Sequence, residues 1–369
     1  MKKALYILLF GAILAFTMLF ILILVSCGGD AAPAVIEYIA PPTPIFTPDP
    51  AASSTPEPDP ISPPPGMAVS LLTGMYISEE AAVRRPFAVV YNNETRAMPQ
   101  AGLMQADILY EVLAEGVTTR LIAIFQDFDA EMIGPIRSTR HYFTYFALDH
   151  GAIMVHHGGS PMGYAAISNR SIPAVDGMRY DGSVFWRDNE RRRTRGMEHS
   201  SFTSAENLLN IAEELNFNMD AAGFLGMFEF FDEPTAPQPE NSALSVEVPF
   251  WGNNITRFEF DPESGLYYKY IFGNPQMDFN VDEHVSVTNV IIQITNISHI
   301  PGDTEGRRNV ELVGSGHGFL ATNGTYSEIY WQKDGPGEPT RWYDSDRNPL
   351  TVNRGRTWIS VIHNEPVFE

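Results

Sequence analysis

The spacing of apolar and polar residues predicts a buried sheet early in the folding part of the chain. Residues 87–91, 108–113 and 120–125 are apolar runs of strand length, rich in β-branched and aromatic side chains. Glu115-Gly116-Val117 stands between the second and third runs and has the composition of a tight turn. We therefore expect three buried strands, the last two joined by that turn.

The next stretch alternates strand-like and helix-like runs. Residues 121–128 continue a strand, a loop follows, and Pro135 stands where a first helical residue can sit, so residues 137–148 are predicted to form a helix. Residues 152–156 form the next strand and residues 162–169 the next helix. Because the connections are short, this order predicts right-handed parallel crossovers and an α/β layer architecture.

A further helix precedes a change of pattern. Thr203 and Glu206 have the spacing of a capping box at the start of a helix that runs to residue 215. The later apolar runs are short, aromatic or β-branched, and separated by Gly, Asp and Asn, which predicts a mostly antiparallel β-rich region. These runs are residues 258–260, 266–270, 290–294, 310–313, 326–331 and 357–362.

The N-terminus has the pattern of a lipoprotein signal. Lys2 and Lys3 form a short basic head, and residues 4–25 carry no charge. Leu24-Val25-Ser26 precedes Cys27, the single cysteine, whose thiol is the nucleophile that a lipid transferase would alkylate. The alternative is an uncleaved transmembrane anchor, since the apolar run is long enough to span a bilayer. Both interpretations place the remaining chain at the extracytoplasmic face of a cell membrane.

The fold class we predict is α/β, with a partly parallel sheet first and a β-rich domain afterwards. Between Cys27 and the first strand the chain is rich in Pro, Ala, Thr, Ser and acidic residues, which favours an extended spacer over a packed domain. The predicted parts are 1–26 (signal peptide), 27–66 (lipidated cysteine and disordered spacer), 67–232 (α/β domain), 233–243 (linker) and 244–369 (β-rich, mostly antiparallel domain).

Composition limits the partners of the folded part. The net charge is −21, and it becomes −23 once Lys2 and Lys3 leave with the signal. This acidity argues against nucleic-acid binding and against an electrostatic hold on anionic lipids. Because the single cysteine is expected to carry lipid, we expect no disulfide, and the 44% of hydrophobic residues must supply the core.

Candidate binding residues follow the predicted strands. Arg137, Arg140 and His141 would occupy the first turns of the predicted helix, where the helix dipole disfavours cations unless an anion or carboxylate lies close. Arg137 and Arg140 are three residues apart and would share a face, which suits bidentate binding of phosphate or carboxylate. The loop that starts at His156 would lie at the same sheet edge, because ligands of open parallel sheets bind beyond the carboxyl ends of the strands.

Three interpretations of these arginines stay open. They can form structural ion pairs with Asp107, Glu111 or Glu115, bind an anionic ligand, or take part in catalysis. His156-His157 is weak evidence for a metal because no further spaced ligand accompanies it. We list the candidate ligand-binding residues as Asp107, Glu111, Glu115, Arg120, Arg137, Arg140, His141, His156, Ser160, Arg187 and His199.

Arg187 belongs to the one basic stretch in this acidic chain, residues 185–195. It is either a solvated loop or a polar flap over the sheet edge, with Trp186 as a stacking surface. His199 precedes two serines, but no activated-serine signature is present. The sequence also lacks a P-loop, a dinucleotide glycine motif, a zinc-protease helix and a calcium loop, so we expect no cofactor and no metal.

Several motifs resemble those of one family. They are Arg85-Pro86-Phe87-Ala88-Val89, Ala106-Asp107-Ile108, Thr119-Arg120, Gly134-Pro135-Ile136-Arg137-Ser138-Thr139-Arg140, His156-His157-Gly158-Gly159-Ser160, Phe185-Trp186-Arg187-Asp188, Trp331-Gln332-Lys333, Pro339-Thr340-Arg341 and Asn353-Arg354-Gly355-Arg356-Thr357-Trp358. Together they resemble the YerB-like lipoproteins, envelope proteins of Gram-positive bacteria with paired domains of unknown function. The resemblance covers roughly residues 71–361. It implies a location in the cell envelope and an arrangement of two paired domains, and it implies no particular reaction.

We expect an accessory protein of the cell envelope that binds an anionic or sugar-containing ligand near Arg137, Arg140, His156 and His199. One alternative is an envelope hydrolase or transferase in which His156 or His199 works with Glu111 or Glu115 as acid and base. Another is a protein-interaction module at the membrane surface. The expected partners are the membrane, through the N-terminal lipid, and a cell-wall glycan, a polyprenyl phosphate or a protein.

Overall fold

A computed structural model describes residues 63–221, 223 and 226–369. The predicted signal, the lipidation site at Cys27 and nearly all of the predicted spacer lie outside the described residues. Within the described ranges, no helix combines the length and the apolar character needed to cross a bilayer.

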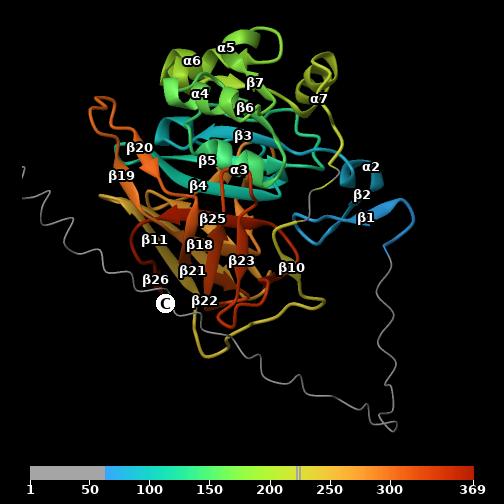
Figure 1. Cartoon of the computed structure of the whole chain (residues 1–369), viewed down its shortest axis with the longest axis vertical. Coiled ribbons are helices and arrows are strands. Elements are labelled where there is room, and N and C mark those ends of the chain that lie inside the picture. Colours follow the sequence, from blue (N-terminus) through green and yellow to red (C-terminus); the bar gives the residue numbers. More distant parts are fainter. Residues whose placement is uncertain (1–62, 222, 224–225) are drawn as a thin grey trace, which may run out of the picture. The chain divides into compact units, whose positions relative to one another are not determined.

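One large sheet takes strands from both predicted domains (Figure 1). In the described part of the chain it has ten strands, in the order β23 (Arg341–Tyr343), β22 (Thr325–Lys333), β21 (Gly314–Thr322), β18 (Asn289–Ile294), β25 (Thr357–Ile362), β4 (Ile108–Glu115), β5 (Thr118–Phe125), β3 (Phe87–Asn92), β6 (Ile153–His156) and β7 (Ala174–Asp176). Strand β25 lies between β18 and β4 and pairs with both in parallel. The two halves of the chain therefore share a backbone hydrogen-bond ladder.

Most neighbouring strands at the centre of this sheet end on the same side. Strands β3 and β4 both run antiparallel to β5 and therefore parallel to each other. Strand β6 is parallel to β3, and β7 is parallel to β6. We call the side on which β18, β25, β4, β3, β6 and β7 end the carboxyl edge. Their last residues are Ile294, Ile362, Glu115, Asn92, His156 and Asp176.

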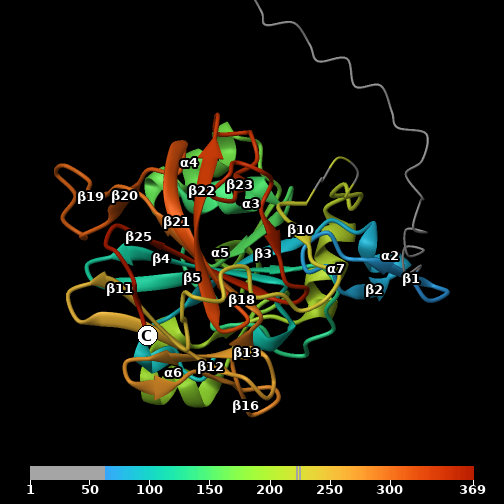
Figure 2. The ribbon, with the colours of Figure 1, turned by 90° about the horizontal axis from the view of Figure 1, so that it is seen from below.

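A smaller antiparallel sheet packs beside the large one (Figure 2). Its strands are β14 (Asn274–Pro275), β13 (Leu266–Ile271), β12 (Asn254–Asp261), β11 (Ser245–Trp251) and β26 (Val367–Phe368), and β17 (Ser286–Val287) also pairs with β13. The ring of Phe258 on β12 meets the fully buried Trp358 of β25 edge-on, with centroids 5.8 Å apart. This sheet and the strands β21 to β23 make the C-terminal region mostly antiparallel, as predicted.

Short hairpins and helices complete the fold. The two-stranded pairs are β1 (Met67–Val69) with β2 (Tyr76–Ser78), β8 (Trp186–Arg187) with β9 (Ser201–Phe202), β10 (Glu229–Phe230) with β24 (Thr351–Val352), β15 (Met277–Asp278) with β16 (Glu283–His284), and β19 (Ile297–His299) with β20 (Arg308–Val310). The helices are α2 (Glu79–Ala82), α3 (Phe143–Asp149), α4 (Pro161–Asn169), α5 (Gly177–Tyr180), α6 (Asn189–Arg195) and α7 (Ala205–Glu214), with 3₁₀ turns at Thr95–Ala97, Leu103–Gln105 and Met197–His199. Helices α4 and α5 lie near β6 and β7 (Figure 1).

The predicted helix over residues 137–148 is wrong for its first half. Helix α3 begins only at Phe143, and the preceding segment is extended. The predicted first parallel crossover is also wrong, because β5 and β6 run in opposite directions. The extended segment before α3 forms backbone hydrogen bonds with residues distant in sequence. The N–H of Arg137 donates to the carbonyl of Val90 (2.8 Å), and the N–H of Ile136 donates to the carbonyl of Ser201 (2.7 Å). The second crossover, from β6 through α4 to β7, is parallel as predicted.

The start of α7 differs from the predicted capping box by one residue. Ser204 is the N-cap, and its hydroxyl accepts a hydrogen bond from the N–H of Asn207 (3.1 Å). The hydroxyl of Thr203 instead donates to the carbonyl of Val184 (2.8 Å). Leu208 and Ala212 are buried on one face of the helix, as the periodicity predicted.

A buried polar network joins the two sheets. Glu111 of β4 and Lys269 of β13 are both fully buried, with carboxylate oxygen and ammonium nitrogen 3.3 Å apart. Glu111 also accepts hydrogen bonds from Asn93 (2.9 Å) and Thr256 (3.2 Å). Lys269 donates to the side-chain oxygen of Gln276 (2.5 Å) and lies 4.5 Å from the ring centroid of Trp358. Each charge is therefore satisfied only in the assembled pair of sheets.

Candidate functional site

The extended segment before α3 crosses the carboxyl edge. The N–H of His157 donates to the carbonyl of Arg137 (3.0 Å), and the N–H of Thr139 donates to that of Gly158 (3.0 Å). The segment thus runs beside the ends of β3 and β6. Arg137 and Arg140 lie at the predicted edge, although no helix N-terminus positions them there.

One carboxylate serves two buried arginines. Glu115, the last residue of β4, forms an ion pair with Arg140 and a second one with Arg120, at 3.1 Å. Both guanidinium groups are nearly inaccessible, with side-chain exposures of 8% and 3%. Burial lowers the pKa of each arginine to about 10, so both remain cationic at neutral pH. Of the three carboxylates predicted to pair with the arginines, Glu115 is the one that does so.

Arg137 is more open and less firmly paired. Its side chain is 26% exposed, and its carboxylate partner is Glu94, at 3.7 Å. Sequence analysis did not single out Glu94, which follows the paired asparagines at the end of β3. Burial lowers the pKa of Arg137, and the neighbouring charge of Arg120 lowers it further. Arg120 is already paired with Glu115, whereas Arg137 has its nearest carboxylate at 3.7 Å, which leaves room for a further negative charge beside Arg137.

Two further arginines reach this edge from the β19–β20 hairpin. Arg308 donates to the carbonyl of Gly116 in the β4–β5 turn, and the N–H of Gly116 donates to the carbonyl of Gly306 (2.9 Å). Arg307 pairs with Asp303 at 2.8 Å. Sequence analysis missed these residues, and the available signal was their adjacency, because two neighbouring arginines are uncommon in so acidic a chain.

We call Arg120, Arg137, Arg140, Arg307 and Arg308 the arginine cluster. In each of the five, the side-chain Nε is buried and has no hydrogen-bond partner, and no other arginine of the described residues shares this feature. A buried N–H without an acceptor costs roughly 1–3 kcal/mol. Five such donors mark this edge of the sheet as a place where the chain itself compensates its cations incompletely.

His199 lies at the same edge, next to Arg137. Its Nδ1 accepts a hydrogen bond from the side-chain amide of Asn92 (2.8 Å), which leaves the proton of the neutral ring on Nε2, 3.5 Å from a carboxylate oxygen of Glu198. Burial lowers the pKa of His199, and the charges of Glu94 and Glu198 oppose that shift. His199 is therefore a neutral donor at the border of the arginine cluster.

His157 and Arg187 form a separate contact. A guanidinium N–H of Arg187 donates to Nε2 of His157 (2.5 Å), so Nδ1 carries the proton and donates to the hydroxyl of Ser201 (2.8 Å). Burial and the charge of Arg187 lower the pKa of His157 to about 4. Arg187 also pairs with Asp181 (3.2 Å), and its contact with His157 holds the β8–β9 hairpin against the end of β6.

His156 and Ser160 have structural partners. Nδ1 of the buried His156 donates to the carbonyl of Gly158 (2.8 Å), and Asp176 lies 3.6 Å away. Ser160 is the N-cap of α4 and accepts a hydrogen bond from the N–H of Gly163 (3.0 Å). These contacts position the loop after β6.

The remaining predicted residues are dispersed. His141, at the start of the α3 region, is hydrogen-bonded to the side chain of Asn309 (3.2 Å), and burial lowers its pKa. Glu111 belongs to the network with Lys269. Asp107 directly precedes β4, at the end of the strand opposite to Glu115. Burial raises the pKa of Asp107 to about 7, and this residue borders a cavity of about 470 Å³ together with Arg356. The contacts of His156 and His199 therefore go to groups other than Glu111 and Glu115.

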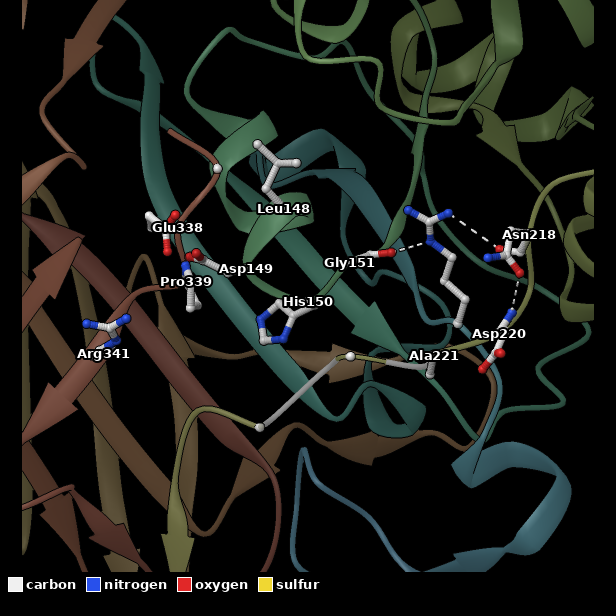
Figure 3. A pocket seen from close by; sticks show the side chains of 14 residues that line it. Leu148, Asp149, His150, Gly151, Asn218, Asp220, Ala221, Glu338, Pro339 and Arg341 are labelled. Atoms are coloured by element: carbon white, nitrogen blue, oxygen red, sulfur yellow. Dashed lines mark hydrogen bonds between the residues drawn. The ribbon is translucent and has the colours of Figure 1, made fainter. Parts of the chain in front are cut away.

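A larger cavity of about 540 Å³ lies beside the end of α3 (Figure 3). Asp149 at its border is buried and accepts hydrogen bonds from Lys333 (2.5 Å) and from the hydroxyl of Thr340 (2.9 Å). His150 shares a hydrogen bond with the hydroxyl of Tyr110 (2.8 Å), and burial lowers its pKa to about 3. Its buried charges are paired with each other, so we regard this cavity as structural.

Comparisons with known proteins cover both halves of the chain. Two family models match: the N-terminal domain of "Protein of unknown function (DUF3048)" over residues 72–218 and its C-terminal domain over residues 246–359. The Bacillus subtilis (strain 168) protein named "Putative lipoprotein YerB" is 32% identical over 295 residues, 79% of this chain and 85% of that protein. A crystal structure of YerB from Bacillus subtilis matches with a TM-score of 0.70 and 30% identity, covering 81% of this chain and 99% of that chain.

Proposed function

Because the chain belongs to the DUF3048 family together with the Bacillus subtilis protein YerB, we propose that it is a lipid-anchored extracytoplasmic protein that binds an anionic ligand of the cell envelope at the arginine cluster. The family resemblance and the α/β fold expected from the sequence are thereby confirmed. The anchor and the ligand are our proposal.

The anchor is supported by the sequence and by the relative. A protein 32% identical to this chain carries "lipoprotein" in its name. Leu24-Val25-Ser26-Cys27 supplies the apolar, small and thiol-bearing residues that lipid attachment requires. With a charge of −23 on the mature part, the protein would be repelled by anionic lipid heads, so acyl chains have to hold it at the membrane.

Replacing the cysteine is expected to release the protein from the membrane. Cys27→Ser removes the nucleophile that accepts the lipid, so the variant should lose incorporation of a labelled fatty acid and move from the membrane fraction to the medium. Ser26→Ala keeps the small residue before the cysteine and serves as the control. If Cys27→Ser stays in the membrane fraction as firmly as the wild-type protein, an uncleaved N-terminal span holds it.

The anionic ligand is supported by one observation above all: the five buried Nε donors of the arginine cluster have no acceptor within the described residues. Arg137 is the accessible member, and its nearest carboxylate is 3.7 Å away. A phosphate, carboxylate or acidic sugar at this point would accept hydrogen bonds from the accessible guanidinium of Arg137 and offset the positive charge of the cluster. A sugar hydroxyl would find His199 as a neutral neighbour.

Loss of two arginines is expected to weaken ligand binding strongly. In Arg137→Ala plus Arg140→Ala, binding of soluble wall fragments or short-chain polyprenyl phosphates, measured by calorimetry, should weaken at least about tenfold, since each charge-assisted hydrogen bond contributes roughly 1.5–3 kcal/mol. Arg140 is buried with Glu115, so Arg137→Ala alone is the variant with the smaller structural cost.

Arg341→Ala is the matched control, because that arginine forms an exposed surface pair with Asp334. Unchanged binding in Arg137→Ala would refute the site. Turnover of the same material by the wild-type protein would identify an enzyme instead of a binding protein.

A further inference from the structure

The charges of the arginine cluster do not balance. Its five guanidinium groups face three carboxylates, which are Glu94, Glu115 and Asp303. Two positive charges therefore remain without a carboxylate at a site where three of the arginines are buried. Burying charges without compensation is costly, so a partner with two negative charges fits better than one with a single charge.

The other groups around the cluster do not change this sum. Glu198 and Arg96, which both act on Arg137 or His199, carry opposite charges. His299 accepts a hydrogen bond from Arg308 (2.8 Å), which requires an unprotonated ring nitrogen. His363, whose pKa is lowered by burial and by Arg308, is neutral as well. Tyr142 keeps its proton, since burial raises its pKa far above neutral.

The five arginines form one electrostatic unit. Arg120 acts on Arg137, and Arg140 shares Glu115 with Arg120. Arg307 in turn acts on Arg140 from the β19–β20 hairpin. Arg137 and Arg307 are each 26% exposed, whereas Arg120, Arg140 and Arg308 are buried. A ligand that arrives from solvent thus meets one accessible arginine from each half of the chain.

We propose that the arginine cluster binds the dianionic phosphate group of a phosphate monoester, held jointly by the N-terminal segment around Arg137 and by Arg307 of the β19–β20 hairpin, which the buried Arg308 fixes against the β4–β5 turn. This inference rests on the proposed function and narrows its ligand class. A phosphate monoester offers three acceptor oxygens and close to two negative charges at neutral pH. A carboxylate offers two oxygens and one charge.

The test uses the full-length protein in detergent and titrates it with glucose 1-phosphate, sulfate and acetate by calorimetry. We expect one glucose 1-phosphate per chain and no measurable acetate binding. Lowering the pH from about 7.5 to about 5.5 should weaken glucose 1-phosphate binding roughly fourfold, because the second ionisation of a phosphate monoester lies near pH 6. Sulfate keeps both charges over this range, so its affinity should stay constant.

The hairpin is tested with Arg307→Ala, because Arg307 is partly exposed and its loss leaves the buried arginines in place. We expect glucose 1-phosphate to bind about tenfold more weakly, the effect of losing one charge-assisted contact. Arg308→Lys keeps the charge but loses the planar fork that bonds Gly116, so it should weaken binding indirectly, by loosening the hairpin. Arg341→Ala should bind like the wild-type protein.

The outcomes separate this inference from the proposed function. If Arg137→Ala loses anion binding while Arg307→Ala and Arg308→Lys retain it, the hairpin takes no part and the inference is refuted, but the proposed function stands. If acetate binds as well as glucose 1-phosphate, the ligand is a monoanion and the inference is likewise refuted. If none of these anions binds, both are refuted.

A phosphate monoester can come from a soluble sugar phosphate or from a lipid headgroup. Flotation with phosphatidylcholine vesicles that do or do not contain phosphatidic acid separates these sources, using Cys27→Ser to remove the anchor. Flotation of the protein with the vesicles that requires both phosphatidic acid and Arg307 identifies a lipid headgroup. Binding of glucose 1-phosphate without flotation of the protein on these vesicles identifies a soluble ligand. Either result supports the phosphate class.

Discussion

Lys269→Met is expected to lower the free energy of unfolding by about 3–5 kcal/mol, since it leaves one charge of a buried pair without its partner. Lys269 and Glu111 are both fully buried. Removing the ammonium group leaves Glu111 in the interior with only neutral donors, among them Asn93 and Thr256. The measurement is equilibrium unfolding in urea, followed by tryptophan fluorescence at neutral pH.

Two further variants serve as controls for the Lys269→Met measurement. The double variant Lys269→Met plus Glu111→Gln removes both charges and keeps the acceptor oxygen, so it should recover at least half of the loss. Arg257→Met breaks the exposed pair of Arg257 with Glu259 on β12 and should change the stability by less than about 1 kcal/mol. A Lys269→Met variant as stable as Arg257→Met would show that the buried pair does not hold the sheets together.

A chain that ends at residue 355 is expected not to fold. This truncation removes β25, whose six residues are all buried, between β18 and β4. Losing Trp358 alone removes a side chain whose truncation typically costs about 3–5 kcal/mol. Ile359, Val361 and Ile362 are buried as well. The combined loss exceeds the roughly 5–15 kcal/mol that stabilises an ordinary domain.

A chain that ends at residue 363 is the matched control. It loses β26, which pairs only with β11 at the border of the smaller sheet, and keeps β25. We expect the control to unfold cooperatively on heating and the shorter chain to show no transition by circular dichroism. A cooperative transition in the shorter chain would mean that the N-terminal part folds without its central neighbour.

The elements that sequence patterns predict correctly are those with local or strongly apolar signals. The runs that became β3, β4 and β5 are buried throughout, and the antiparallel strands of the C-terminal region are separated by turn residues. The failure is the predicted helix over residues 137–148. Its first residues bond to Val90, Ser201 and Gly158, which are far away in the sequence, and such partners leave no local pattern.

The candidate site shows the same division. Arg140, Glu115 and Arg120 come together as an ion-pair group, which was one of the interpretations that the residue types allowed, whereas Arg137 pairs with Glu94. Arg307 and Arg308 were not foreseen, because they reach the site only when the β19–β20 hairpin docks on the β4–β5 turn. Asp107 precedes the strand that ends at Glu115 and Glu111 lies within it, and both have other partners.

The position of β25 in the chain also determines when the large sheet can be completed during synthesis. Strand β4 is synthesised roughly 240 residues before β25, the strand that pairs with it. During synthesis and export β4 therefore has an unpaired hydrogen-bonding edge. Unfinished molecules therefore present a template for wrong pairing with other chains or for attack by proteases. We expect newly exported copies to depend on protection by folding helpers until their final segment arrives.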